Sequence, residues 1–146
     1  MLNRLQGVFE SLHRHDVRYV VMGGIAAVLY GVPRATFDLD LLIDATQENV
    51  ERLLRAFIDA GLGTADLVEP AEVLANEITI FKDRVRVDIF TTTMGLDFEH
   101  AWSNKVSMDY RGQSFYVVSK EDLKAAKRAA GRTVDLEDVR LLELPD

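Results

Sequence analysis

Apolar positions recur along this chain with two different periods, which predict helices and strands in turn. Residues 47–60 carry an apolar stripe at helical spacing that ends before Gly61, and residues 2–15 show a similar stripe. A short run rich in β-branched residues, such as residues 18–22, is typical of a buried strand instead. The pattern predicts helices at residues 2–15, 25–30, 47–60, 70–75, 120–130 and 134–142. It predicts strands at residues 18–22, 37–43, 77–81, 85–90, 106–110 and 114–118.

Turn and capping residues separate these elements. Gly31 and then Pro33 follow the short helix at 25–30, and Ser119 is placed to cap the helix that follows it. Helices mixed with a largely consecutive set of strands indicate an α/β fold in which helices pack on a sheet. With 146 residues and neither a repeat nor a linker, the sequence predicts one domain over residues 1–146.

Composition narrows the class of protein. The sequence has no cysteine, which excludes disulfides, thiolate zinc sites and cysteine nucleophiles. Hydrophobic content of 48% and charged content of 28% are those of an ordinary globular protein. No leader-like segment is present, and no apolar stretch approaches the roughly 20 residues of a membrane span, so we expect a cytoplasmic protein without a membrane partner. The net charge of −7 disfavours a broad non-specific nucleic-acid binder but leaves room for a local basic patch.

A glycine pair follows the first predicted strand. Gly23 and Gly24 lie between that strand and the helix at 25–30, where bare backbone N–H groups meet the start of a helix. Such a turn lets a ligand approach closely and favours an anion such as a phosphate. Glycine pairs at turns are common and most bind nothing, so this feature does not identify a ligand by itself.

Two aspartates occupy alternate positions of the next predicted strand. Asp38 and Asp40 are two residues apart, so both side chains leave the same face of the strand. Neighbouring carboxylates repel unless a cation compensates them, and Mg²⁺ takes one or two carboxylates together with substrate phosphates. The alternative is a solvent-facing acidic strand end. The apolar residues 41–43 favour a buried strand over that alternative.

A third aspartate lies in an otherwise apolar strand. Asp88 is flanked by Val87 and Ile89, and an unpaired buried carboxylate is costly. A structural pair with Arg86 would satisfy Asp88, and so would a metal ion. Together with Asp38 and Asp40, we interpret Asp88 as a third metal-site carboxylate, because three carboxylates can hold the two-metal arrangement of phosphate chemistry.

The combined pattern resembles the nucleotidyltransferase superfamily, in which Gly-Gly begins a helix, Asp-x-Asp lies on the next strand and an acidic residue lies on a later strand. Within it, the chain is most similar to minimal, AbiEii-like bacterial proteins, whose Arg-x-Thr-x-Asp-x-Asp pattern is read here from Arg34 to Asp40. The similarity extends to the tail, where such proteins carry a lysine on a helix, Gly-Arg and then aspartates. The matching tail residues here are Lys127, Gly131, Arg132, Asp135 and Asp138.

The resemblance implies a fold and a reaction. The fold would be the polymerase-beta-like nucleotidyltransferase fold, a mixed sheet flanked by helices. Gly23 and Gly24 would cradle the triphosphate of a nucleoside triphosphate, and Asp38 and Asp40 would bind Mg²⁺. Asp88 would complete the metal site and assist deprotonation of an acceptor hydroxyl, with attack at the α-phosphate and release of pyrophosphate.

Basic and hydroxyl side chains supply further nucleotide-binding candidates. Arg34 could clamp phosphate oxygens and Thr36 could fix the loop or touch a phosphate, although both could simply order a turn. Lys127 is favoured by the resemblance, and the helix face it shares with Lys120 and Lys124 is otherwise typical of a solvated surface. We interpret Asp135 as a capping or pairing residue.

Other polar and aromatic residues point more weakly to function. His13 and His15 do not share a helix face, so we interpret them as surface residues, not as a metal pair. Trp102 could stack on a base, but packing is the commoner role for a single tryptophan.

The leading hypothesis is an active Mg²⁺-dependent nucleotidyltransferase of the kind found in toxin–antitoxin or phage-defence systems, with a cognate antitoxin as a possible partner. Its acceptor could be RNA, a protein or a small molecule. The alternatives are a non-catalytic nucleotide-binding or antitoxin-like partner module with the same fold, and a metal-dependent phosphohydrolase that uses the same carboxylates.

Overall fold

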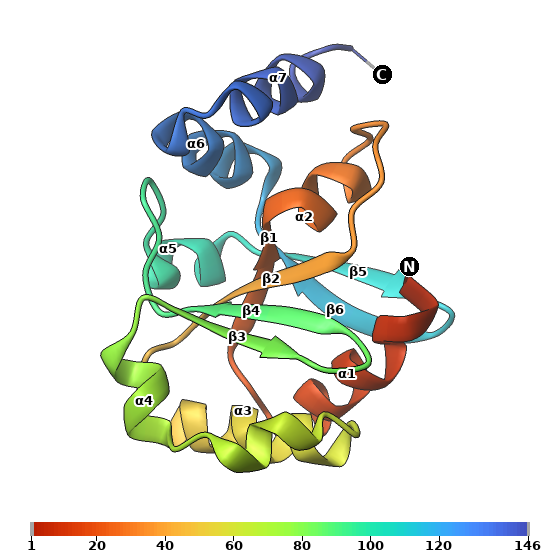
Figure 1. Ribbon diagram of the computed structural model, residues 1–146. Helices are drawn as coiled ribbons and strands as arrows, with labels where there is room; N and C mark the ends of the chain where they lie inside the picture. Colours follow the sequence, from red (N-terminus) through yellow and green to blue (C-terminus); the bar gives the residue numbers. More distant parts are fainter. Residues whose placement is uncertain (1, 146) are drawn as a thin grey trace.

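One mixed sheet organises the protein, which we describe from a computed structural model over residues 2–145 (Figure 1). Its six strands follow the order β3-β4-β2-β1-β6-β5. The strands are β1 (Tyr19–Met22), β2 (Asp38–Ile43), β3 (Ile78–Lys82), β4 (Arg86–Phe90), β5 (Val106–Tyr110) and β6 (Gln113–Val117). Strand β2 is parallel to β4 and antiparallel to β1, and β1 is parallel to β6. The two hairpins, β3–β4 and β5–β6, are antiparallel. The predicted α/β fold with a mixed sheet is confirmed.

Helices pack on the sheet from two sides. They are α1 (Leu2–Arg14), α2 (Gly23–Leu29), α3 (Gln47–Asp59), α4 (Pro70–Ala75), α5 (Phe98–Ser103), α6 (Lys120–Ala130) and α7 (Thr133–Leu142), with a 3₁₀ turn, η1 (Gly63–Leu67). Helices α1 and α3 lie together on one side of the sheet, whereas α2, α6 and α7 lie on the other (Figure 1). No helix within residues 2–145 has the length and apolarity needed to span a bilayer.

The helices form where their caps and apolar faces predict them. The Thr46 side chain accepts a hydrogen bond from the Asn49 N–H at the start of α3, and Phe57 from the same helix is fully buried. Ile58, an apolar residue of the stripe predicted over residues 47–60, is 42% exposed, so the buried face of this helix is narrower than the sequence indicated. The strong periodicity of α1, α3 and α6 therefore located these helices but slightly overestimated the buried face of α3.

The two faces of the central strands differ in chemistry. Leu39 and Leu41 of β2 are fully buried in the core. Asp38 and Asp40 alternate with them and so lie on the opposite face. The register places Asp40 beside Asp88 of β4 and beside Met22 at the end of β1. The sheet thus gathers its acidic residues on the face toward α2, α6 and α7.

Candidate active site

The glycine pair makes room for the chain's own side chains. Helix α2 begins at Gly23 itself, two residues before the predicted start, and Gly23 has a left-handed φ of +70°. A Cβ at Gly23 would overlap Oδ2 of Asp40, and one at Gly24 would lie 2.9 Å from Oγ1 of Thr36. Glycine is therefore required here because Asp40 and Thr36 approach the backbone closely. Both glycines also line the cavity described below.

Asp40 is the least compensated of the three aspartates. No hydrogen bond or ion pair to its carboxylate forms among residues 2–145. Burial, together with the negative charges of Asp88 and Asp38, raises the pKa of Asp40 to about 7, although Arg86 and Lys127 offset part of this effect. A half-buried carboxylate with a raised pKa, surrounded by like charges, is an arrangement that a cation would stabilise.

Asp88 is already paired. Nε of Arg86 lies 2.9 Å from Oδ1 of Asp88, and Nη2 lies 3.2 Å from Oδ2. The pairing that the sequence left open as an alternative to metal binding is therefore present, and within residues 2–145 no three acidic or histidine side chains form a ready-made metal cage. Mg²⁺ is usually bound by one or two carboxylates with phosphates and water, so Asp38 and Asp40 fit such an ion without a third protein ligand.

A basic cluster lies across the cavity from Asp40. Nζ of Lys127 on α6 is 2.8 Å from Oδ2 of Asp138, and Nη2 of Arg34 is 2.8 Å from the same oxygen. Lys127 and Asp138 are buried, with 6% and 2% of their surfaces exposed. One carboxylate from α7 therefore holds a lysine from α6 and an arginine from the loop before β2, a role for Asp138 that its spacing did not reveal.

Asp135 holds a third cation at the cavity. Its Oδ2 lies 2.7 Å from Nε of Arg132 and also accepts a hydrogen bond from the Arg132 backbone N–H, which begins α7. Burial alone would raise the pKa of Asp135, but the hydrogen bonds and charge of Arg132 lower it. The interpretation of Asp135 as a capping and pairing residue is confirmed by these contacts.

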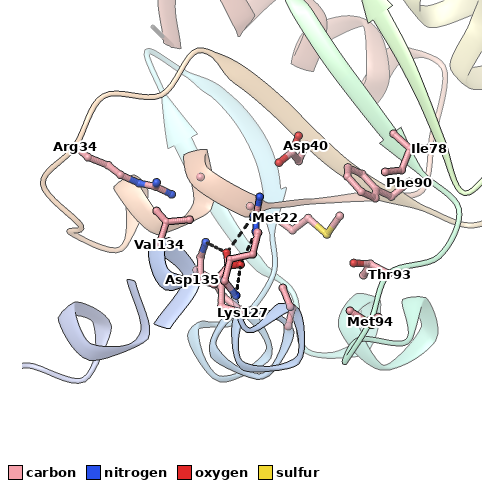
Figure 2. Close-up of a pocket in the computed structure, with 16 residues that line it drawn as sticks. Met22, Arg34, Asp40, Ile78, Phe90, Thr93, Met94, Lys127, Val134 and Asp135 are labelled. Atoms are coloured by element: carbon pink, nitrogen blue, oxygen red, sulfur yellow. Dashed lines mark hydrogen bonds and ion pairs between the residues drawn. The ribbon is translucent and has the colours of Figure 1, made fainter. Parts of the chain in front are cut away.

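A cavity of about 560 Å³ joins these groups (Figure 2). Gly23, Gly24 and Asp40 line one part of it, and Arg34, Lys127 and Arg132 line another. Ile78, Phe90 and Met94 add an apolar wall that sequence analysis did not anticipate, because β3 and the loop after β4 reach the site only through the fold. Asp38, Thr36 and Asp88 are not among the lining residues. Asp38 instead lines a smaller hollow beside Arg86.

Comparisons with known proteins show the family and the fold of the chain. Residues 2–145 match the family described as "Nucleotidyltransferase of unknown function (DUF6036)". The chain belongs to this family. The fold of this nucleotidyltransferase family member is similar to the crystal structure of a candidate nucleotidyltransferase from Thermotoga maritima, with a TM-score of 0.61 and 20% sequence identity over 96% of this chain and 90% of that one. No curated protein matches the chain in sequence.

The weaker candidates of this family member have structural partners. Trp102 stacks on Phe98 with ring centroids 5.8 Å apart, lies under the Lys105 ammonium and packs against Tyr116 of β6. His13 is hydrogen-bonded to the Tyr19 hydroxyl at 2.7 Å and is only partly exposed, so its interpretation as a surface residue is wrong in part. These contacts account for both residues without a ligand.

The lysines of α6 have different partners. Nζ of Lys124 is 3.0 Å from Glu121 on the same helix, which is the intrahelical pairing that the sequence left open, but the Lys124 side chain is only 12% exposed and so is not fully solvated. Lys127, one turn further along, is buried instead and lines the cavity. Spacing alone could not separate them, because both lie on one helix face and only the packing of α7 covers Lys127.

Proposed function

We propose that this protein is a metal-dependent nucleotidyltransferase that transfers a nucleoside monophosphate from a nucleoside triphosphate to an acceptor hydroxyl. The observation that carries the proposal is the cavity, in which Asp40 and the cations Lys127, Arg34 and Arg132 line a common space. A metal–triphosphate complex presents positive charge at the metal and negative charge on its phosphates, so acidic and basic walls suit its two ends. Membership of a nucleotidyltransferase family supports the same class of reaction.

The basic wall would bind the triphosphate. Arg34 and Lys127 are held by Asp138 with N–H groups still free to meet phosphate oxygens, since a guanidinium has five donors and an ammonium three. Arg132 adds a third cation at the cavity. Gly23 and Gly24 carry no side chain, so phosphate oxygens can come close to the backbone there. Thr36 would contribute indirectly by packing over Gly24.

The acidic wall would serve the reacting groups. Asp38 and Asp40 would hold Mg²⁺, which supplies charge neutralisation for the triphosphate. Asp88 lies beside Asp40 in the β2–β4 register and would be the third carboxylate of the metal site. Asp88 would also take the proton of the acceptor hydroxyl. The acceptor oxygen forms a bond to the α-phosphorus, the bond from the α-phosphorus to the bridging oxygen breaks, and pyrophosphate leaves. Positioning and charge compensation account for the rate in this scheme.

The proposal treats residues 1–146 as one domain, because all six strands of the described residues belong to one sheet. It extends to a cytoplasmic role in a toxin–antitoxin or phage-defence system with a cognate antitoxin as partner, which the AbiEii-like sequence pattern supports. RNA, protein and small molecules are the acceptor classes to test.

Label transfer tests the reaction directly. The protein is incubated with Mg²⁺ and each α-³²P-labelled nucleoside triphosphate in turn, with total bacterial RNA, a protein lysate or a small-molecule extract as acceptor. We expect label on one acceptor class with the native protein and none with Asp40→Asn. The exposed Asp66 on η1 provides a matched control, and Asp66→Asn should transfer label normally. Absence of transfer from every triphosphate to every acceptor would contradict the proposal.

The Arg86–Asp88 pair favours a second candidate function. Both oxygens of Asp88 already accept hydrogen bonds from Arg86, as expected of a nucleotide-binding module that keeps the fold without catalysis. Such a module would bind a non-hydrolysable nucleoside triphosphate analogue, with loss of binding in Lys127→Met, but would transfer no label. Binding together with transfer excludes this candidate.

A further inference from the structure

The guanidinium of Arg86 lies among the carboxylates of the proposed metal site. Arg86 and Asp88 are two residues apart on β4, so their side chains leave the same face, and the register places Arg86 beside Asp38. In addition to its two contacts with Asp88, Nε of Arg86 lies 3.7 Å from Oδ2 of Asp38. Arg86 therefore joins the aspartate of β4 to an aspartate of β2.

This contact compensates charge while no metal is bound. Asp88 is only 8% exposed, so its carboxylate would be costly without a cation or several donors. Arg86 supplies that cation and two hydrogen bonds, whereas its own side chain keeps 38% of its surface exposed. A divalent ion beside the same carboxylates would repel the guanidinium and compete with it for their oxygens.

We propose that Arg86 is a positioning residue that acts as an internal counter-ion, holding Asp88 and Asp38 in the metal-free protein and releasing them when a divalent cation binds. The inference rests on the proposed function, since it requires a metal at Asp38 and Asp40. The released side chain has room in a hollow of about 180 Å³, whose lining includes Asp38, Asp83 and the cations Arg4, Lys82, Arg84 and Arg86. The exposed carboxylate of Asp83 accepts hydrogen bonds from the Arg84 and Thr64 N–H groups and keeps further acceptor sites for the guanidinium.

Metal binding without nucleotide tests the inference. Mn²⁺, a spectroscopically visible substitute for Mg²⁺, is titrated into the full chain, and free Mn²⁺ is measured by electron paramagnetic resonance. Because Arg86→Gln removes the competing cation, we expect its Kd for Mn²⁺ to be about three- to tenfold lower than that of the native protein. A merely structural role for Arg86 predicts the opposite, weaker binding.

Lys82→Gln is the matched control. Lys82 lies opposite Arg86 in the β3–β4 register and carries the same charge, but it forms no ion pair within residues 2–145. We expect less than about a twofold change in its Kd, because exposed charges are strongly screened. Asp40→Asn should abolish the binding in every background, which ties the measured site to the proposed one.

A second measurement follows the native protein, and a variant is needed only to assign one resonance. The Arg86 Nε–H resonance is assigned by its loss in Arg86→Lys, and its exchange with water is followed during a Mg²⁺ titration. Because the hydrogen bond to Asp88 protects this proton, we expect exchange to become faster with the same midpoint as Mg²⁺ binding. Exchange that stays constant as Mg²⁺ saturates the protein would overturn the inference.

The outcomes separate the two proposals. Mn²⁺ binding that depends on Asp40 but is not tighter in Arg86→Gln overturns the counter-ion role and leaves the proposed function standing. Equal tightening in Lys82→Gln also overturns it, since long-range charge would then explain the effect. Binding that does not depend on Asp40, or no binding at all without nucleotide, overturns the counter-ion role, and the label-transfer assay alone then decides the proposed function.

Discussion

Among single residues, Gly23 and Gly131 share a backbone conformation but differ in their neighbours. Their φ values are +70° and +68°, yet a Cβ would overlap the Asp40 carboxylate at Gly23 and would come no closer than 3.6 Å to the Arg128 carbonyl at Gly131. We therefore expect Gly131→Ala to lower the free energy of unfolding by about 1 kcal/mol, from left-handed strain alone. Gly23→Ala should show that strain and also displace Asp40, so nucleotidyl transfer is lost. Urea denaturation measures the loss of stability in both variants, and the label-transfer assay measures the loss of activity expected only in Gly23→Ala. Equal activity in the two variants would contradict the close approach of Asp40 to Gly23 as the cause.

The raised pKa of Asp40 predicts how stability depends on pH. Its folded-state pKa of about 7 lies above the ordinary aspartate value of 3.8, so between these pH values the folded protein holds a proton there that the unfolded chain has lost. Stability from this group is therefore full below the unfolded pKa and is lost as pH rises toward 7. Asp40→Asn imitates the protonated form and should stabilise the protein more at pH 8 than at pH 5. The two gains in the free energy of unfolding should differ by roughly 2 kcal/mol.

Denaturation curves in EDTA at both pH values check this prediction, because chelation removes any bound metal. Asp66→Asn serves as the exposed control and should leave the difference between the two pH values unchanged. A gain from Asp40→Asn that is equal at pH 5 and pH 8 would mean that the Asp40 carboxylate is ionised throughout this range.

Sequence reasoning was strongest for residues whose geometry follows from strand period. Asp38 and Asp40 lie on one face as their spacing required, and Asp88 joins that face through the β2–β4 register. The strand period alone could not decide whether Asp88 pairs with Arg86 or binds a metal. It puts Arg86 on the same face as Asp88, and it puts the other two aspartates there as well. Arg132 and Asp138 could be matched to a sequence pattern, but their contacts depend on how α6 and α7 fold over α2.

At the scale of elements, Asp138 joins α7 to α6 and to the loop before β2. Its carboxylate contacts Lys127 and Arg34, and it is 2% exposed. Asp138→Asn would leave a buried ammonium without its closest carboxylate, which typically costs about 3–5 kcal/mol. We expect this loss in urea denaturation, together with faster amide exchange in α6 and α7. The neighbouring Glu137→Gln breaks only the exposed pair with Arg140 and should leave the urea midpoint unchanged.

The longer helices were predictable from their period, whereas a short helix needed a clear start signal, such as Pro70 at the start of the six-residue helix α4. Helices α3 and α6, with 13 and 11 residues, have enough turns to show a periodic apolar face. Helix α5 has six residues and was not predicted, although the side chain of Asp97 caps it by accepting from the His100 N–H. That capping signal was readable, but fewer than two turns cannot establish a period. Helix α2 begins two residues before its predicted start, because Gly23 and Gly24 are part of the helix. The sequence suggested that they precede it.

For the whole molecule, the cavity is a product of topology. Its walls come from the end of β1 and start of α2, from β2, from β3 and the loop after β4, and from α6 and α7 (Figure 1). The hydrophobic pattern predicts each element separately but carries no signal for the order β3-β4-β2-β1-β6-β5, which brings β1 between β2 and β6. Sequence therefore named most of the polar groups of the site, whereas the apolar wall and the 560 Å³ space required the fold.

Because the walls come from separate parts of the chain, a bound nucleotide should stabilise the molecule as a unit. A non-hydrolysable triphosphate analogue with Mg²⁺ at about 100 times its Kd adds about 2.7 kcal/mol to the free energy of unfolding, or roughly 8 °C in Tm for a protein of this size. Hydrogen exchange should then slow both in β2, next to Asp40, and in α6, next to Lys127, since the ligand bridges them. Slowing confined to one of these elements would place the nucleotide on a single wall and contradict the two-walled site. Slowing in both, lost in Asp40→Asn and kept in Asp66→Asn, is the result that the cavity predicts.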